Sequence, residues 1–237
     1  MTKSKLRKLK YCNIALIDYK EAWDLQKDVL EARSNDLIDD TFFLLEHYNT
    51  YTLGKVADKK HLISSDSFLK QNKISVYEID RGGDITYHGH GQIVGYPIIN
   101  LSDWQKDTHK FLRALEEVII NTCDHYRITA GRNNKYTGVW IDNRKIAAIG
   151  IKVKKWVTMH GFAFNINTDL SFFQGIIPCG IDDKEVTSLN KELGKKIEIE
   201  EVKEILLLNF KEVFGYNQIR HINYDEFSLS VMDNINN

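Results

Sequence analysis

The chain has 237 residues, of which 43% are apolar and 27% are charged, and its formal net charge is −1. This composition is typical of a folded globular protein and excludes a disordered chain. No apolar run reaches the roughly 18 to 20 residues that span a bilayer, so we expect no membrane association. Three scattered cysteines form neither a disulfide framework nor a metal-binding CxxC pair, which favours a reducing, cytoplasmic location.

Hydrophobic periodicity predicts the elements along the chain. A strand at 11–16 and a helix at 19–33 come first, and strands follow at 41–47, 51–54, 74–81 and 92–101. After an amphipathic helix at 108–125, two strand-like runs flank Asp142 and Asn143, which tolerate turn conformations and therefore predict a hairpin. A strand at 157–167, a helix at 200–213 and a frayed tail from about 226 to 237 complete the series. We expect a single α+β domain over residues 1–237, with a mixed or antiparallel β-sheet packed against helices.

Glycines concentrate in the middle of the chain, where 11 of the 14 lie within residues 82–180. The stretch RGGDITYHGHGQIVGYP at 81–97 is the densest part. It does not fit a P-loop, and its GxGxxxG spacing before strand-forming residues does not fit a dinucleotide fingerprint. His88 and His90 have no further ligand at metal-binding spacing, so a metal site is disfavoured and His88 is interpreted as a hydrogen-bonding pocket wall. We place the candidate site in this glycine-rich segment.

Cys179 differs from the other two cysteines, Cys12 and Cys123, which are interpreted as small apolar fillers. It stands between Pro178 and Gly180, a setting in which the backbone before the thiol is restricted and the next amide can approach a ligand. This setting favours a nucleophile with a nearby oxyanion donor over an ordinary turn cysteine. A thiol of ordinary pKa about 8.5 needs a cation or base beside it. The candidates are Lys145, His88 and His160.

Basic residues predominate over 127–155, where eight of them accompany one acid, Asp142. The run is either a solvated strand face or a docking surface for an acidic partner.

Five blocks taken together resemble the lipoyl(octanoyl) transferases, which share a fold with biotin and lipoate protein ligases. The blocks are LLEHYNTYTLG, RGGDITYHGHGQIVGYP, GVWIDNRKIAAIGIKV, HGFAFNINTDLSFF and IIPCGIDDKEVTSL, in this order. The resemblance implies the biotin/lipoate protein ligase catalytic-domain fold. It also implies transfer of an octanoyl group from octanoyl-acyl carrier protein to a lysine of lipoyl domains, those of 2-oxoacid dehydrogenase complexes and of glycine cleavage H protein.

The resemblance also implies roles for particular residues. Cys179 would be the acyl-thioester nucleophile, and Lys145 would lower the pKa of its thiol and exchange protons. The substrate-binding positions would be Arg81, Gly82, Gly83, Asp84, Ile85, Thr86, Tyr87, His88, Ala148, Ile149, Gly150, Gly161, Phe162 and Ala163. The one departure is His90, which stands where the family usually has proline.

The implied enzyme is a cytoplasmic monomer that needs no ATP and no metal and binds neither nucleic acid nor membranes. Three other interpretations remain open. They are an ATP-dependent lipoate or biotin ligase on the same fold, a nucleic-acid-binding module that uses the basic run, and a Cys–His hydrolase that uses His160.

Overall fold

The computed structural model describes residues 6–177 and 185–228. Its largest element is a mixed sheet with the strand order β12-β1-β2-β6-β10-β9-β8-β7, and β11 pairs with β9 outside this path. The strands are β1 (Lys8–Asn13), β2 (Asp40–Leu45), β6 (Gln92–Ile98), β7 (Gly131–Arg132), β8 (Val139–Ile141), β9 (Arg144–Lys154), β10 (Val157–Asn165), β11 (Glu185–Val186) and β12 (Gln218–His221). The strands β12, β1 and β2 run parallel, whereas β2, β6, β10 and β9 are successively antiparallel.

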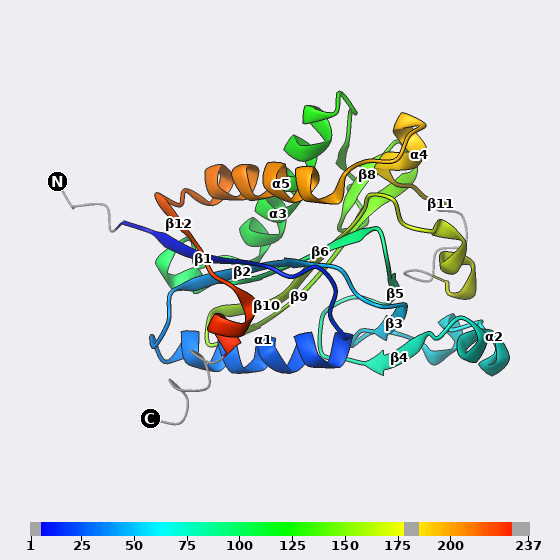
Figure 1. The fold of residues 1–237 in the computed structure, drawn as a ribbon, viewed down its shortest axis with the longest axis horizontal. Helices are drawn as coiled ribbons and strands as arrows, with labels where there is room; N and C mark the ends of the chain where they lie inside the picture. The colour runs from blue at the N-terminus through cyan, green and yellow to red at the C-terminus, as the bar shows by residue number, and fades with distance from the viewer. Residues whose placement is uncertain (1–5, 178–184, 229–237) are drawn as a thin grey trace.

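Helices cover both faces of this sheet (Figure 1). On one face lies α1 (Tyr19–Ser34), which begins where the Asp18 carboxylate accepts hydrogen bonds from two backbone amides. On the other face lie α3 (Thr108–His125) and α5 (Ile199–Phe214). Each helix buries one apolar side against the sheet, and the two resulting hydrophobic cores are separated by the strands themselves.

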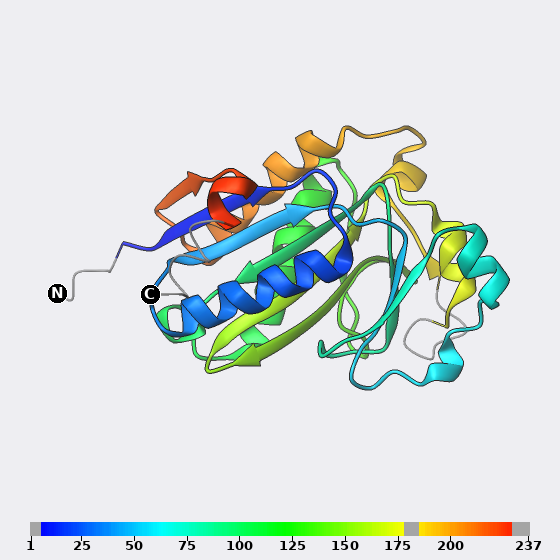
Figure 2. The same ribbon diagram turned by 60° about the horizontal axis from the view of Figure 1, so that its bottom comes forward.

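A second, three-stranded sheet stands beside the end of the main sheet, next to the N-terminal end of α1 (Figure 2). Its order is β4-β3-β5, with β3 (Thr50–Leu53) in the centre, β4 (Ser75–Glu78) parallel to it and β5 (Ile85–His88) antiparallel. The short elements are η1 (Lys59–His61), α2 (Asp66–Gln71), η2 (Leu101–Asp103), η3 (Leu170–Gly175) and α4 (Leu189–Leu193). Residues of η3 pack against this small sheet and give it a core of its own.

The structure confirms most of the elements predicted from periodicity and the expected α+β class. The helix at α3 and the turn at Asp142, whose φ is 52°, are as predicted. The first strand is displaced to β1, because residues 14–18 leave the sheet to start α1. The strand β5 was not predicted, although its residues Ile-Thr-Tyr-His are good strand formers.

Near the end of the described chain, residues 224–228 are helical, and Phe227 is fully buried with its ring against that of Phe43. The remaining positions of the tail expected to be frayed, 229–237, lie outside the described residues, so that expectation stays a prediction. Among the helices that the structure describes, each is too short or too polar to cross a bilayer.

Candidate functional site

A cavity of about 540 Å³ opens between the main sheet and the second sheet. Thirteen of the fourteen substrate-binding positions expected from the sequence line it, and Lys145 lines it as well. These residues come from segments 81–88, 145–150 and 161–163 of the chain, and the fold brings them together. His160, a candidate base from the sequence, lines the cavity too. The cavity also has lining residues that were not predicted: Tyr19, Gln92, Val94, Tyr96, Thr108, Leu112, Lys135, Tyr136, Thr137, Ile151, Val153, Asn165, Phe173 and Val186.

The floor of the cavity is built from small residues on three neighbouring strands. Ala163 of β10 lies opposite Val94 of β6 on one side and Ala148 of β9 on the other. Residues paired across antiparallel strands share a face, so these side chains form one row on the α1 side of the sheet. Because these side chains are short, they leave a hollow on this face of the sheet. The larger side chains on the opposite face fill the corresponding space.

The Arg81–Gly83 loop forms the roof of the cavity and packs directly against Gly150. The Gly82 amide donates to the Ile151 carbonyl over 2.9 Å, which holds the Arg81–Gly83 loop against β9. A Cβ added at Gly150 would lie 2.7 Å from the Gly82 carbonyl oxygen, so this close approach requires glycine. The Arg81 guanidinium donates to the carbonyl and hydroxyl oxygens of Thr52 over 2.7 and 2.9 Å, so the arginine secures the roof to β3.

A chain of hydrogen bonds crosses the cavity from the roof to the floor. The Thr52 hydroxyl pairs with His88 Nε2 over 3.3 Å, and His88 Nδ1 donates to Gln92 Oε1 over 2.9 Å. The Gln92 amide then donates to Asn165, whose amide donates to the Thr187 carbonyl. Burial lowers the pKa of His88 well below its ordinary value, so the ring is neutral. The interpretation of His88 as a hydrogen-bonding wall residue is confirmed.

His160 occupies a strained position at the opposite end of the cavity from Lys145. Its φ is 61°, in the left-handed region that a non-glycine residue rarely adopts inside a strand. The backbone amide is thereby turned to Gln26 of α1, whose Oε1 accepts over 2.9 Å. The ring is 1% exposed and donates from Nε2 to Asp80 Oδ1 over 2.8 Å, and Asp80 also pairs with Lys152. Burial lowers the pKa of His160, whereas the hydrogen bond from His160 lowers that of Asp80.

Lys145 lies half-buried near the start of β9 at the other end of the cavity. Its ammonium nitrogen is 4.8 Å from the centroid of the Trp140 ring, a favourable cation–π arrangement. Its backbone is held on both sides, by Trp140 of β8 and by Val186 of β11. Cys179, the predicted nucleophile, lies outside the described residues, so the structure gives no distance between its thiol and Lys145.

Tyr87 is the one predicted substrate-binding residue whose side chain does not line the cavity. Strand alternation turns it to the opposite side of β5 from Thr86 and His88. Its hydroxyl donates to Asn49 Oδ1 over 2.8 Å, and its ring stacks on Phe172. Tyr87 thus belongs to the core of the second sheet, and its role in substrate binding stays a prediction.

The other two cysteines are buried in the two hydrophobic cores, as expected. Burial raises the pKa of the Cys12 thiol to about 11 and that of Cys123 to about 12, so neither is a nucleophile near neutral pH. His90 is exposed and contacts the edge of the Tyr48 ring, with the ring centroids 5.9 Å apart. Among the described residues, no group of three or more His, Cys, Asp and Glu side chains is arranged to hold a metal ion.

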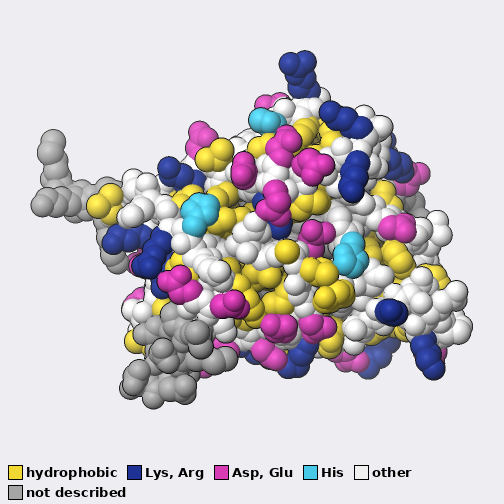
Figure 3. All heavy atoms as spheres, in the orientation of Figure 1, with side chains coloured by type: hydrophobic (Ala, Val, Ile, Leu, Met, Phe, Trp, Pro, Cys, Tyr) yellow, Lys and Arg dark blue, Asp and Glu magenta, His cyan; other side chains and the backbone are white. Residues whose placement is uncertain are grey.

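The basic run at 127–155 does not form a continuous free surface. Arg132 pairs with Glu116 and Glu117, Arg144 pairs with Glu192, and Lys152 pairs with Asp80. On the face drawn in Figure 3, acidic and basic side chains are likewise interspersed with apolar ones. Tertiary ion pairs thus neutralise part of the charge that the sequence concentrates in this run.

Comparisons with known proteins agree with this geometry. Residues 18–211 match the lipoyl protein ligase A/B catalytic domain family. The chain is 48% identical over 219 residues to the octanoyltransferase of Christiangramia forsetii, covering 85% of this chain and 94% of that protein. It is also 48% identical over 206 residues to the octanoyltransferase of Caldicellulosiruptor bescii, covering 86% and 90%.

Among solved structures, lipoate-protein ligase A bound with ATP superposes with a TM-score of 0.75 at 17% identity, covering 96% of this chain and 93% of that one. At this identity the likeness shows the fold alone, and it confirms the lipoate ligase fold expected from the sequence. The family match and the identities to the two octanoyltransferases show to which family within this fold the chain belongs. The chain belongs to the octanoyltransferases of the lipoyl protein ligase A/B catalytic domain family and is an acyltransferase.

Proposed function

We propose that this chain transfers an octanoyl group from octanoyl-acyl carrier protein to a lysine of lipoyl domains, through an acyl thioester on Cys179. The observation that carries the proposal is a cavity with a floor of small apolar residues and a lysine at one end. Burying about six methylenes of an acyl chain there at about 0.8 kcal/mol each provides roughly 5 kcal/mol of binding. The reacting carbonyl group would then lie at the end of the cavity near Lys145.

In the first step, the Cys179 thiolate attacks the carbonyl carbon of the octanoyl thioester. The bond to the carrier thiol breaks, and that thiol leaves with a proton from the Lys145 ammonium or from solvent. A positive charge on Lys145 favours the thiolate over the thiol, which is the form that reacts. A backbone amide at Cys179 or Gly180 would stabilise the oxyanion.

In the second step, the amine of the acceptor lysine attacks the Cys179 thioester. A carbon–nitrogen bond forms, the carbon–sulfur bond breaks, and neutral Lys145 accepts the proton that the amine loses. A thioester is already activated relative to an amide, so we propose that the reaction needs neither ATP nor a metal ion.

The described residues around Lys145 support this assignment of roles. Val186 follows Cys179 by seven positions in the chain, lines the cavity and pairs with Lys145 of β9. The Thr187 amide donates to the Lys145 carbonyl over 2.9 Å. The segment that follows the nucleophile is thus attached to the strand that carries the lysine.

We further propose that the acceptors are the lipoyl domains of 2-oxoacid dehydrogenase complexes and glycine cleavage H protein. We also propose that the enzyme acts as a cytoplasmic monomer. The name of the octanoyltransferase relatives supports the identity of the transferred group.

Incubation with octanoyl-acyl carrier protein alone, followed by intact-mass measurement, tests the nucleophile and the ATP independence together. We expect one octanoyl adduct that is labile to hydroxylamine and absent from Cys179→Ser. Cys12→Ala and Cys123→Ala are matched controls, because these buried thiols should leave the adduct in place. An adduct that forms only with ATP and free octanoate would instead indicate an adenylating ligase.

The pH dependence of thiol alkylation tests the role of Lys145. In Lys145→Ala, the apparent pKa of Cys179 should rise toward the ordinary thiol value of about 8.5. Lys145→Arg should keep the thiolate and the adduct but slow the transfer to the acceptor, because arginine stays protonated. An unchanged alkylation profile in Lys145→Ala would remove the lysine from the mechanism.

A further inference from the structure

We propose that the part of the cavity on the α3 side of β9 holds the phosphopantetheine arm of the donor, and that Lys135 binds the phosphate group of this arm. The inference rests on the proposed function, since it takes the donor to be an acyl thioester on a carrier protein. Carrier proteins hold the thioester at the end of such an arm, a flexible chain that contains amide groups and a phosphate group. Neither Lys135 nor this part of the cavity has a role in the proposed mechanism.

The cavity continues past its floor of small residues onto the other face of β9. Alternation along the strand turns Ile149, Ile151 and Val153 away from the face that carries Ala148, and they pack against the core formed with α3 and α5. They line the same cavity as Ala148 does. We name this part the α3-side lobe, and its lining residues are Thr108, Leu112, Tyr136, Ile149, Ile151 and Val153.

The α3-side lobe lies along an open edge of β9. On this edge β8 pairs with residues 144–147 of β9, and its pairing goes no further. Beyond residue 147, the Ile151 carbonyl accepts from the Gly82 amide of the roof loop. Residues 148–153 are half-buried, so this edge gives a flexible chain a route from solvent toward Lys145.

The loop between β7 and β8 holds Lys135 beside the proposed reaction centre. Asn133 Oδ1 accepts from the Lys135 amide over 2.8 Å, and the fully buried Glu116 accepts from the Gly138 amide over 3.2 Å. A Cβ added at Gly138 would lie 3.5 Å from Lys145 Cε. The loop is therefore fixed at both ends, with Lys135 three residues along the chain from a direct contact with the Lys145 side chain.

The charge of the cavity favours an anionic occupant. Arg81, Lys135 and Lys145 line it, whereas Asp84 is the one acidic residue among its described lining residues, and Asp84 is already paired with His61 over 2.6 Å. Lys135 is exposed and makes no ion pair with any described residue. A phosphate group can therefore accept a charge-assisted hydrogen bond from it. The acceptor lysine carries a positive charge before it reacts, so the donor arm is the better match for this lobe.

The test compares the octanoyl thioesters of phosphopantetheine and of pantetheine, which lack the carrier protein and differ only in the phosphate group. Intact-mass measurements over time give the rate constant of acyl-adduct formation for each donor. The wild-type enzyme should react at least about tenfold faster with the phosphorylated donor, as expected for one charge-assisted hydrogen bond. Lys135→Ala should lose most of this preference, whereas Lys135→Arg should keep most of it because arginine retains the charge.

Lys154→Ala is the matched control. Lys154 is also an exposed lysine, at the end of β9, but it does not line the cavity. Its replacement should leave the donor preference unchanged. Equal rates with both donors in the wild-type enzyme overturn the proposal, as does a preference in Lys135→Ala within about twofold of wild type or an equal loss in Lys154→Ala. An effect of Lys135→Ala on the transfer to the acceptor alone would assign the lobe to the acceptor and also overturn it.

Binding of the arm without an acyl group separates this proposal from the proposed function. Calorimetry should show that phosphopantetheine binds the wild-type enzyme at least about tenfold more tightly than pantetheine does, and that Lys135→Ala removes the difference. If no donor gives an acyl adduct but this difference is present, the transfer mechanism fails and the arm site stands. If adducts form but neither rates nor binding depend on Lys135, only the arm site fails.

Discussion

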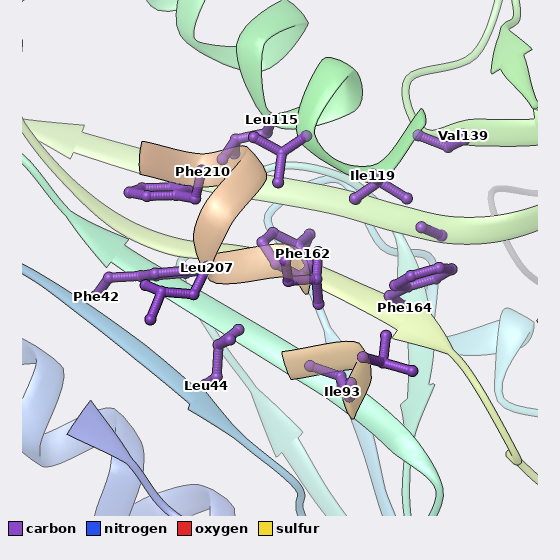
Figure 4. Close-up of a cluster of buried hydrophobic side chains, with 14 of the residues drawn as sticks. Phe42, Leu44, Ile93, Leu115, Ile119, Val139, Phe162, Phe164, Leu207 and Phe210 are labelled. Carbon is purple, nitrogen blue, oxygen red and sulfur yellow. The ribbon is translucent and has the colours of Figure 1, made fainter. Parts of the chain in front are cut away.

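The two faces of strands β6, β10 and β9 have opposite properties although they share a backbone. On the α3 and α5 face, Ile93 and Phe164 pack in a core with residues of α3 and α5 (Figure 4). On the α1 face, Val94, Ala163 and Ala148 leave a cavity. Alternating side chains point to opposite faces of a strand, so adjacent positions in the sequence specify a packed core and a binding slot independently. The following predictions test that independence.

The largest expected effect comes from filling the slot. In Ala148→Leu, the added side chain should occupy the space of the acyl chain and lower kcat/KM up to about a thousandfold, since roughly 5 kcal/mol of chain burial is at stake. The melting temperature should change little because the new side chain enters a hollow. Ala147→Leu is the matched control on the packed face, where overpacking should cost about 1–3 kcal/mol of stability. Equal losses of activity in the two variants would contradict the separation of the faces.

The opposite pattern is expected in the packed core. Phe210 is fully buried, and its ring stacks on Phe42 with the centroids 4.0 Å apart. Phe210→Ala should lower the free energy of unfolding by about 3–5 kcal/mol, because it loses buried surface and leaves a void. Denaturant unfolding measures this loss. The kcat/KM for octanoyl transfer by the remaining folded enzyme should equal that of wild type, and a changed value would show that the two faces are coupled.

A pH effect is expected from His47, which is buried and hydrogen-bonded to the Tyr96 hydroxyl. Burial lowers the pKa of His47 from 6.5 to about 4. Below pH about 6.5 the unfolded chain therefore protonates this histidine, whereas the folded protein does so only below pH about 4. Because the unfolded state binds more protons in this window, the free energy of unfolding falls as the pH drops through it. The loss amounts to about 3 kcal/mol at 1.36 kcal/mol per pH unit.

Unfolding of His47→Gln at pH 6.5 and pH 4.5 measures this contribution. The variant should lose less stability than wild type over that interval. His125→Gln, at an exposed position, should keep the wild-type dependence. Parallel curves for wild type and His47→Gln would show that His47 does not carry the effect.

The smallest effect is expected in the loop between β5 and β6. His90→Pro should stabilise the protein by about 0.4–1 kcal/mol, because proline restricts the unfolded chain at an exposed loop position. Octanoyl transfer should be unchanged, since His90 does not line the cavity. Thermal unfolding and kcat/KM measure the two quantities, and a loss of activity would assign His90 a role in the site.

Much of the site could be predicted because its residues are concentrated in short blocks. The blocks at 81–88, 148–150 and 161–163 line one cavity in the structure, Tyr87 excepted. Tyr87 packs away from the cavity because it alternates with His88 along β5, and this strand was not predicted from the sequence. Gln92 and Asn165 were missed for a different reason. Their role depends on a hydrogen bond between residues 73 positions apart, which local patterns do not contain.

Periodicity and short motifs are local properties, so the residues alone predicted the three long helices, most of the strands and the chemical character of the site. The depth of the cavity and the strained conformation of His160 follow from the tertiary structure. These features depend on which residues of distant strands become neighbours. Sheet register and the packing of α1 and the roof loop on the sheet determine which residues become neighbours. Both depend on long-range contacts.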